Sequence, residues 1–259
     1  MTLPVAVRVA LVGASGRMGQ AIERLARESN GVFEVVARAS EGDDLGALAR
    51  SRPHAAIDFS TPESTRALAA VAADARVPLV VGTTGLSSVH MSALEAAAAV
   101  VPVFVASNMS VGVFVLGELV AQATAMLGEG FDLEIVEAHH RKKADAPSGT
   151  ALTLLATAQR ARGQSADAAG ATHAADDRAV VHGRSGQPGP RPRGEIGVHA
   201  LRGGDVIGDH HVHFLGDGER IELVHRATSR DVFASGALRA ARWLANQSPG
   251  LYGMRDLVR

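Results

Sequence analysis

The segment VAVRVALVGASGRMG, residues 5–19, decides the fold of the N-terminal part of the chain. Val5–Val12 is β-branched and almost entirely apolar, which predicts a parallel strand buried on both faces. The glycines that follow predict a tight turn, and Met18–Arg27 carries apolar residues at helical spacing. A strand, a glycine turn and a helix in this order predict the opening of a dinucleotide-binding fold.

The turn itself is expected to bind the dinucleotide. It consists of Gly13, Ala14, Ser15, Gly16, Arg17, Met18 and Gly19. Glycine lets the backbone approach a pyrophosphate closely, and the N–H groups of a helix N-terminus attract its charge. The spacing is G-x-x-G-x-x-G, with Ser15 where the usual fingerprint has its second glycine, so a plain glycine turn is the alternative. The strand before it and the helix after it favour the cofactor site.

Four more short apolar runs repeat the strand pattern over the first 109 residues. They are Phe33–Ala39, Ala55–Phe59, Leu79–Val81 and Val103–Ala106. Alanine-rich stretches such as Glu63–Ala75 separate them and predict helices. This alternation predicts an α/β domain with a Rossmann-type, doubly wound parallel sheet.

The end of the predicted second strand bears on the choice of cofactor. It reads Ala37-Arg38-Ala39-Ser40 and lacks the acidic residue with which NAD-specific sites bind the ribose hydroxyls. Arg38 and Arg17 are expected near that ribose, where they would attract a 2′-phosphate. The predicted cofactor is therefore NADPH, NADH or both, with NADPH used at least as well as NADH.

Beyond Ser110 the pattern becomes that of a second domain. Helices are expected from there through Met126 and over Ser148–Arg162. Period-two strands are expected at Phe131–Ala138, Ile196–Leu201, Asp205–Leu215 and Arg220–Ala227. One packed and one wetter face predict an α+β domain with a mixed, open sheet.

Two further segments complete the chain. Gly163–Gly194 is rich in proline, glycine and alanine and predicts a long surface loop, with at most a short strand at Ala179–His182. Val232–Asn246 predicts an amphipathic helix that returns to the first domain.

The densest group of chemically active side chains lies in residues 137–150, EAHHRKKADAPSGT. Pro147, Ser148 and Gly149 suit the start of a helix, and Ser148 or Thr150 can donate a hydroxyl, so this second helix N-terminus is another anion site. Lys143 and His140 are expected to bind carboxylate groups beside it. His139 is expected to donate a proton, because an ordinary histidine pKa near 6.5 permits this at neutral pH. The alternative is a solvated basic loop.

A metal site is weighed and rejected at His210, His211 and His213. Two of these imidazoles share one strand face, but the sequence signals no third ligand. They are interpreted as polar strand positions, and no metal is predicted.

Composition excludes several classes of protein. The 259 residues are 46% hydrophobic and 20% charged, as in an ordinary globular protein. With 26 basic and 27 acidic residues the chain has no net field for nucleic acid or an anionic membrane. The absence of cysteine suits a reducing compartment, and we expect a cytoplasmic protein. The charge-free stretch between Glu95 and Glu118 is long enough for a membrane span, but Pro102 and the polar run around Asn108 divide it.

These motifs closely resemble the dihydrodipicolinate reductase family. The resemblance rests on VGASGRMG at 12–19, DFSTPE at 58–63, GTTG at 82–85, ASNMSVG at 106–112, EAHHRKKADAPSGTA at 137–151, GERIELVHRATSR at 218–230 and the tail LYGMRDLV. It covers essentially the whole chain. Lys142 departs from it, because some members have histidine there.

The resemblance implies reduction of 4-hydroxy-tetrahydrodipicolinate to tetrahydrodipicolinate with NADH or NADPH, in lysine and diaminopimelate biosynthesis. It implies that His139 donates the proton with help from Lys143. It implies that the substrate carboxylates are held by His140, Lys143, Ser148, Gly149 and Thr150, with Thr84 nearby. It also implies that the nicotinamide is flanked by Gly82, Thr83, Thr84, Ala106, Ser107, Asn108 and Met109.

The implied organisation is a dinucleotide-binding domain of residues 1–109 with 231–259, and a substrate and tetramerisation domain of residues 110–230, with hinges near Ser110 and Arg230. The implied partners are a small dicarboxylate and three further copies of the chain. Two alternatives stay open: another amino-acid pathway dehydrogenase, acting on diaminopimelate or homoserine, and a non-catalytic dinucleotide sensor.

Overall fold

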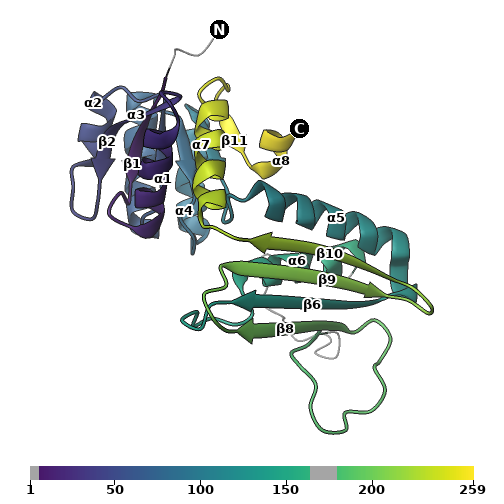
Figure 1. Cartoon of the computed structure of the whole chain (residues 1–259). Coiled ribbons are helices and arrows are strands. Elements are labelled where there is room, and N and C mark those ends of the chain that lie inside the picture. The colour runs from purple at the N-terminus through teal and green to yellow at the C-terminus, as the bar shows by residue number, and fades with distance from the viewer. Residues whose placement is uncertain (1–5, 164–179) are drawn as a thin grey trace. The chain divides into compact units, whose positions relative to one another are not determined.

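The computed structural model describes residues 6–163 and 180–259 (Figure 1). The chain divides into two compact units. The first comprises the described residues up to Val111 together with Arg230–Arg259, and the second is Gly112–Ser229. The functions predicted for the two domains stay predictions at this point.

The first unit is built on a six-stranded parallel sheet. Its strands are β1 (Val7–Val12), β2 (Phe33–Ala39), β3 (Ala55–Asp58), β4 (Leu79–Val81), β5 (Pro102–Val105) and β11 (Gly250–Tyr252). Their order is β11-β5-β4-β3-β1-β2, and every neighbouring pair is parallel. The predicted doubly wound sheet is confirmed, and β11 is an edge strand that the sequence did not predict.

Helices cover both faces of this sheet (Figure 1). They are α1 (Arg17–Glu28), α2 (Leu45–Arg50), α3 (Pro62–Ala75), α4 (Ser88–Ala98), α7 (Asp231–Leu244) and the short α8 (Met254–Val258). Helices α2, α3 and α4 pack together on one face through buried Leu48, Leu68 and Leu94. Helices α1 and α7 contact each other on the other face, and α7 belongs to the first unit.

The strand order reverses between β1 and β3, because the chain moves from β1 outward to β2 and then returns to the other side of β1. Ligands of open α/β sheets bind at the carboxyl ends of the strands at such a reversal. In this unit those ends are Val12, followed by the glycine turn, and Asp58.

The second unit contains a mixed sheet of five strands. They are β6 (Asp132–His139), β7 (Val180–Val181), β8 (Ile196–Arg202), β9 (Gly208–Leu215) and β10 (Arg220–Ala227). The order is β10-β9-β6-β8-β7, with β8 parallel to β6 and β7, and β9 antiparallel to β6 and β10. The mixed sheet is confirmed, but β9 starts at Gly208 rather than at Asp205. Of the predicted loop Gly163–Gly194, residues 164–179 lie outside the described part of the chain.

One face of the mixed sheet is covered by α5 (Val111–Leu127) and α6 (Gly149–Ala161), and the short η1 (Gly128–Gly130) follows α5. Leu116 of α5, Leu154 of α6 and Ile135 of β6 belong to the same buried cluster. Strand alternation therefore sends Leu133, Ile135, Glu137 and His139 of β6 toward the helices.

Among the described helices, the segment Val111–Gly130 is long and apolar enough to cross a membrane by composition alone, with a mean hydropathy of 1.6. The sequence had suggested a different charge-free stretch, which the structure divides into α4, β5 and the start of α5. Leu116 and Val120 of this helix pack into the core of the second unit. A core helix passes the same test, so length and composition are weak grounds for a span.

Candidate functional site

The turn after β1 has the geometry of a dinucleotide-binding loop. Gly13 has a φ of +76°, and a Cβ there would lie 2.2 Å from the Phe59 carbonyl oxygen. A Cβ on Gly19 would lie 2.4 Å from the Gly13 carbonyl oxygen, so α1 packs directly on the loop. Gly16 precedes α1 without a side-chain cap, and no side chain covers the helix N-terminal amides from that position. These residues fit the pyrophosphate of a dinucleotide.

Hydrogen bonds fix this loop to the end of β2. The N–H groups of Gly13 and Ala14 donate to the Ala39 carbonyl oxygen at 2.9 and 3.1 Å. The Ser15 N–H donates to Ser40 Oγ at 3.3 Å, and the two serine hydroxyls are 3.0 Å apart. The loop is thus held in place without contributing its own side chains to the core. Arg17 is exposed and Met18 is half-buried.

Arg38, which the sequence predicts near the cofactor ribose, is paired with an acidic residue of α1. Its Nη2 donates to Glu23 Oε1 at 2.7 Å, which joins β2 to α1. The hydrogen bond from Arg38 lowers the pKa of Glu23. A longer ion pair with Arg27 lowers the pKa of Glu23 further. An acid therefore lies beside the arginine that was expected to attract a 2′-phosphate.

The GTTG turn after β4 is anchored by a buried carboxylate, Asp58. Thr83 Oγ1 donates to Asp58 Oδ2 at 3.1 Å, and the Ser60 N–H donates to Asp58 Oδ1 at 3.1 Å. Thr65 Oγ1 and Ser60 Oγ donate to the same carboxylate. Burial raises the pKa of Asp58 above its ordinary value, although these hydrogen bonds oppose the rise. The structure therefore turns Thr83 inward and leaves Thr84 exposed.

Two other predicted cofactor residues have structural contacts. A Cβ on Gly82 would lie 2.3 Å from the Phe59 ring, so only glycine fits there. Met109 is 1% exposed, and a Cβ on Gly236 of α7 would lie 1.8 Å from its carbonyl oxygen. Ala106 and Asn108 are half-buried, while Ser107 is exposed. Of the ASNM turn, the Met109 side chain is thus part of the core.

In the second unit, β6 ends at His139 and places its ring beside a buried carboxylate. His139 Nδ1 lies 2.6 Å from Glu137 Oε2, and the His139 side chain is 12% exposed. Glu137 is fully buried. Burial alone would raise its pKa, but hydrogen bonds from Arg202, His139 and the Ser148 N–H lower it below the ordinary value. Glu137 is therefore ionised at neutral pH.

The predicted anion site at the start of α6 lies next to this carboxylate. The Ser148 N–H donates to Glu137 Oε1 at 2.9 Å, and Ser148 Oγ caps the helix by accepting from the Ala151 N–H at 3.2 Å. Ser148 is buried, Gly149 is exposed and Thr150 is half-buried. The structure thus brings together His139 and the helix N-terminus within one unit.

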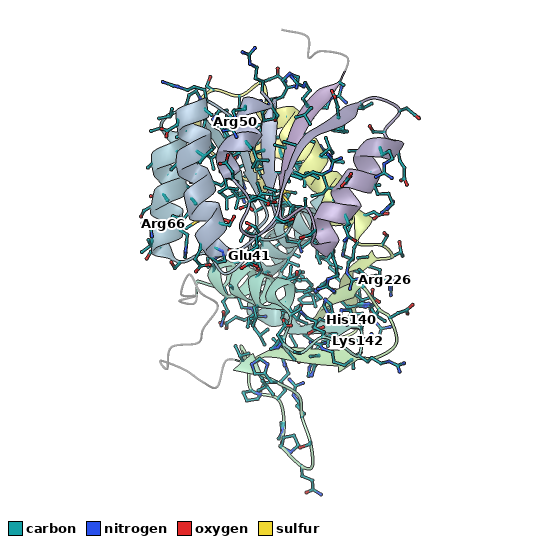
Figure 2. The ribbon with its side chains drawn as sticks, turned by 90° about the vertical axis from the view of Figure 1, so that its left-hand side faces the viewer. Glu41, Arg50, Arg66, His140, Lys142 and Arg226 are labelled. Carbon is teal, nitrogen blue, oxygen red and sulfur yellow. The ribbon has the colours of Figure 1, made fainter. Side chains whose placement is uncertain are left out.

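The loop between β6 and α6 carries the basic side chains, of which His140 and Lys142 are labelled in Figure 2. Lys143 Nζ donates to both oxygens of Asp145, at 2.8 and 2.7 Å. This contact lowers the pKa of Asp145. Lys143 is therefore engaged by an acid two residues away, which a ligand carboxylate must displace or share. Lys142 is exposed and His140 is half-buried.

His210 of β9 is a site residue, not merely a polar strand position. Its ring is buried, packs edge-on against the His139 ring with centroids 5.3 Å apart, and reaches Ser148 Oγ at 3.2 Å. Burial lowers the pKa of His210 from 6.5 to about 4, and the nearby His139, His225 and His211 add to this, whereas Glu137 opposes it. His210 is therefore neutral at neutral pH. Among the described residues no group of three or more His, Asp or Glu side chains could hold a metal ion.

Because the pKa of His210 is lowered, we expect the free energy of unfolding to depend on pH in the acid range. Between about pH 6.5 and 4 the unfolded chain binds a proton at this position and the folded chain does not, so folding stability falls as the pH is lowered. We expect this group to cost about 2 kcal/mol at pH 5 relative to pH 7.5. Urea unfolding at both pH values should show that part of the loss in the native chain and not in His210→Gln. An equal loss in both chains would contradict it.

The site residues that sequence reasoning missed are Glu137, Arg202, Asp145, His210 and Asp58. Glu137 and Asp58 are the first residues of two of the motifs that carry the family resemblance, EAHHRKKADAPSGTA and DFSTPE. Both alternate with apolar residues or end a strand, so a local pattern marks them as ordinary polar positions. Arg202 and His210 reach the site only through the pairing of β8 and β9 with β6.

Comparisons with known proteins agree with this architecture. Residues 7–109 match the family model described as dihydrodipicolinate reductase, N-terminus, and residues 112–258 match dihydrodipicolinate reductase, C-terminus. The chain is 44% identical to 4-hydroxy-tetrahydrodipicolinate reductase of Myxococcus xanthus, covering 97% of both chains. It is 46% identical to the enzyme of the same name from Desulfovibrio desulfuricans, covering 96% of this chain and 98% of that one.

Solved structures share the fold. Dipicolinate-bound dihydrodipicolinate reductase from Paenisporosarcina sp. TG-14 superposes with a TM-score of 0.77 at 24% identity, covering 97% of this chain and 99% of that one. DAP dehydrogenase of C. glutamicum in complex with DAP gives a TM-score of 0.56 at 14% identity, covering 99% and 96%. Because both are under 25% identical to this chain, these likenesses show the fold alone. Two family models and near-full-length relatives above 40% identity place this chain in the dihydrodipicolinate reductase family.

Proposed function

We propose that this 4-hydroxy-tetrahydrodipicolinate reductase binds the substrate carboxylates at the start of α6 and protonates the reduced ring from His139. The observation that carries the proposal is the single carboxylate of Glu137, which contacts both His139 Nδ1 and the Ser148 N–H. A proton donor and an anion-binding helix N-terminus are thereby held side by side. That is the arrangement a small dianion needs if it is to be bound and protonated at one place.

The family implies a nicotinamide dinucleotide as cofactor. We assign the pyrophosphate to residues Gly13–Gly19 and the nicotinamide to Gly82–Thr84 and Ala106–Met109. The glycine contacts after β1 and the exposed Thr84 support this. When bound, the reduced nicotinamide would supply a hydride to the ring carbon para to the substrate nitrogen, after the hydroxyl group on that carbon has left as water.

The remaining steps belong to the side chains of the second unit. His140, Lys143 and residues Ser148–Thr150 hold the two carboxylates. Without substrate, the Lys143 ammonium group donates to both carboxylate oxygens of Asp145. When the substrate binds, its carboxylate replaces that of Asp145 as the acceptor. His139 Nε2 then delivers a proton to the enamine that hydride addition leaves, and the Lys143 ammonium stabilises the negative charge beside it.

An assay with freshly made 4-hydroxy-tetrahydrodipicolinate tests the function. Oxidation of NADPH and NADH is followed by the loss of absorbance of the reduced nicotinamide. Both cofactors should be oxidised only when substrate is present. Calorimetry with pyridine-2,6-dicarboxylate separates the sensor alternative, since a sensor that retains only the nucleotide site does not bind this planar dianion. Cofactor binding without turnover and without dianion binding would sink the reductase proposal.

We also propose that NADPH is used at least as well as NADH, with Glu23 limiting the preference. Glu23 competes with a 2′-phosphate for Arg38. In Glu23→Gln the ratio of kcat/KM for NADPH to that for NADH should rise by roughly twofold to fivefold, as the loss of an exposed pair worth about 0.5 to 1 kcal/mol predicts.

The matched control is Glu28→Gln on the same helix, where Glu28 pairs with Arg24 instead. Its cofactor ratio should equal that of the native chain. If Glu23→Gln leaves the ratio unchanged, Arg38 does not contact the cofactor. A native preference for NADH above about tenfold, or roughly 1.4 kcal/mol, would also defeat the proposal.

The protein is proposed to be a cytoplasmic homotetramer. The sheet face of the second unit opposite α5 and α6 carries Leu201, Leu215 and Val224, which are 57%, 38% and 39% exposed. Strand alternation and register place these three on one face of neighbouring strands. Burial of such a face between copies would remove it from water. Analytical ultracentrifugation should give the mass of four chains, and a monomer at micromolar concentration would contradict the assembly.

A further inference from the structure

Both oxygens of the Glu137 carboxylate are hydrogen-bonded, and each oxygen has two partners. Oε2 lies 2.6 Å from His139 Nδ1 and accepts from Arg202 Nη1 at 2.8 Å. Oε1 accepts from Arg202 Nη2 at 2.8 Å and from the Ser148 N–H at 2.9 Å. The arginine therefore grips the carboxylate with both arms of its fork, which is the strong, oriented form of this contact. A residue that is fully buried and held in this way cannot turn.

The pairing decides which nitrogen of His139 carries the permanent proton. An ionised carboxylate only accepts hydrogen bonds, so His139 Nδ1 must be the donor. The other ring nitrogen, Nε2, is then the atom that takes up and releases a proton. Position 208 is glycine, and a Cβ there would lie 3.1 Å from His139 Nε2, so the absence of a side chain leaves room around that nitrogen.

The same carboxylate also fixes the substrate-binding end of the unit. It anchors the first amide of the α6 cap at Ser148, and Arg202 Nη2 donates in addition to the Asp145 carbonyl oxygen at 2.7 Å. Arg202 thereby ties down the loop that carries Lys143. One ion pair, with a buried carboxylate and a half-buried arginine, holds the strand end, the basic loop and the helix start in a single arrangement.

We propose that Glu137 is the positioning residue of this reductase: clamped by Arg202, it holds His139 in the Nδ1–H form so that Nε2 faces the substrate as the proton donor. The proposal rests on the proposed function of His139. It adds that the proton donor works only while a charged carboxylate orients it. Glu137 touches neither substrate nor cofactor, and acts through His139 and Ser148.

The chain supplies a matched control in Glu134, three residues earlier on β6. Its carboxylate is also bound by arginine, since Arg184 Nη2 and His199 Nε2 contact it at 2.8 and 2.6 Å. Strand alternation points Glu134 to the opposite face of the sheet from His139. Glu134→Gln is therefore the same substitution, on the same strand and among the same kinds of partner, without the contact to the proton donor.

The test compares the full-length chain carrying Glu137→Gln or Glu134→Gln. A glutamine can present its amide N–H₂ to His139 Nδ1, which favours the other tautomer. We expect kcat of Glu137→Gln to fall by roughly 100-fold, the lower end of what a positioned general acid contributes, with KM changed by less than about threefold. Glu134→Gln should keep kcat within about twofold of the native value.

A spectroscopic readout separates positioning from mere loss of structure. Two-bond ¹H–¹⁵N correlation spectra of the histidine rings report the tautomer of His139, assigned with His139→Gln. The native chain and Glu134→Gln should show the Nδ1–H form, and Glu137→Gln should lose it. Because Glu137→Gln leaves the half-buried Arg202 without its carboxylate partner, the double variant Glu137→Gln with Arg202→Gln removes both charges and tests whether a loss of activity reflects unfolding.

The outcomes are distinct. An inactive native chain overturns the proposed function, while the tautomer measurement still decides the role of Glu137. An active native chain with kcat of Glu137→Gln or of the double variant within about twofold of it overturns the positioning role. So does an Nδ1–H signal that persists in these variants, or an equal loss of kcat in Glu134→Gln.

Discussion

In His139→Gln, kcat should fall by roughly 100-fold to 10,000-fold while KM changes little, because proton donation acts in the transition state and not in substrate binding. The structure adds a physical reason for choosing this histidine. Its Nδ1 is held at 2.6 Å from the Glu137 carboxylate, and only Nε2 remains for the chemistry. Steady-state kinetics with saturating NADPH give both constants.

The control for this variant is His211→Gln on β9. His211 lies on the opposite face of the sheet from the buried His210 and stacks against His213, with ring centroids 6.0 Å apart. Its replacement should leave kcat unchanged. A His139→Gln enzyme with near-normal kcat would remove His139 from the mechanism, whatever the state of the control.

Lys143→Ala should raise KM and lower kcat together, each by roughly 3-fold to 10-fold. Loss of a hydrogen bond between charged groups costs about 1.5 to 3 kcal/mol, and part of this is felt only when the ring carries extra negative charge. In the structure the Lys143 ammonium holds Asp145, so its charge is already oriented in the loop between β6 and α6. Initial rates and dipicolinate binding measure the two effects separately.

Asp145→Asn is the companion variant to Lys143→Ala, because it should change KM for the substrate in the opposite direction. The amide weakens the competing contact to Lys143 but preserves the backbone carbonyl that accepts from Arg202. KM for the substrate should therefore be equal to or lower than the native value. If Lys143→Ala leaves KM unchanged, or Asp145→Asn raises it as strongly as Lys143→Ala does, Lys143 does not bind the carboxylate.

The fold was predicted from local pattern where the pattern was strong. Val7–Val12 and Ile135 with its neighbours have the apolar spacing of strands, and the structure confirms them. The short elements were missed, because α2 has six residues and β11 three, which is too little sequence for a periodic signal. β11 forms only because β5 offers it an open edge.

The candidate site was predictable where it is contiguous. His139, Lys143 and Ser148 lie on one strand end, one loop and one helix start, so their order in sequence nearly fixes their order in space. Arg202 is 65 residues from Glu137 and His210 is 62 residues from Ser148, and strand register brings them to the site. No local pattern encodes that register.

The sequence alone determined the two kinds of sheet, the glycine turn after β1 and the candidate for the proton donor, because each depends on residues that are neighbours in the chain. Only the tertiary structure decided which charges are paired: Arg38 with Glu23, Lys143 with Asp145, and Arg202 with Glu137. The physical reason is that an ion pair between side chains is fixed by how strands and helices pack. Burial then decides whether such a pair orients a catalytic group or merely sits in water.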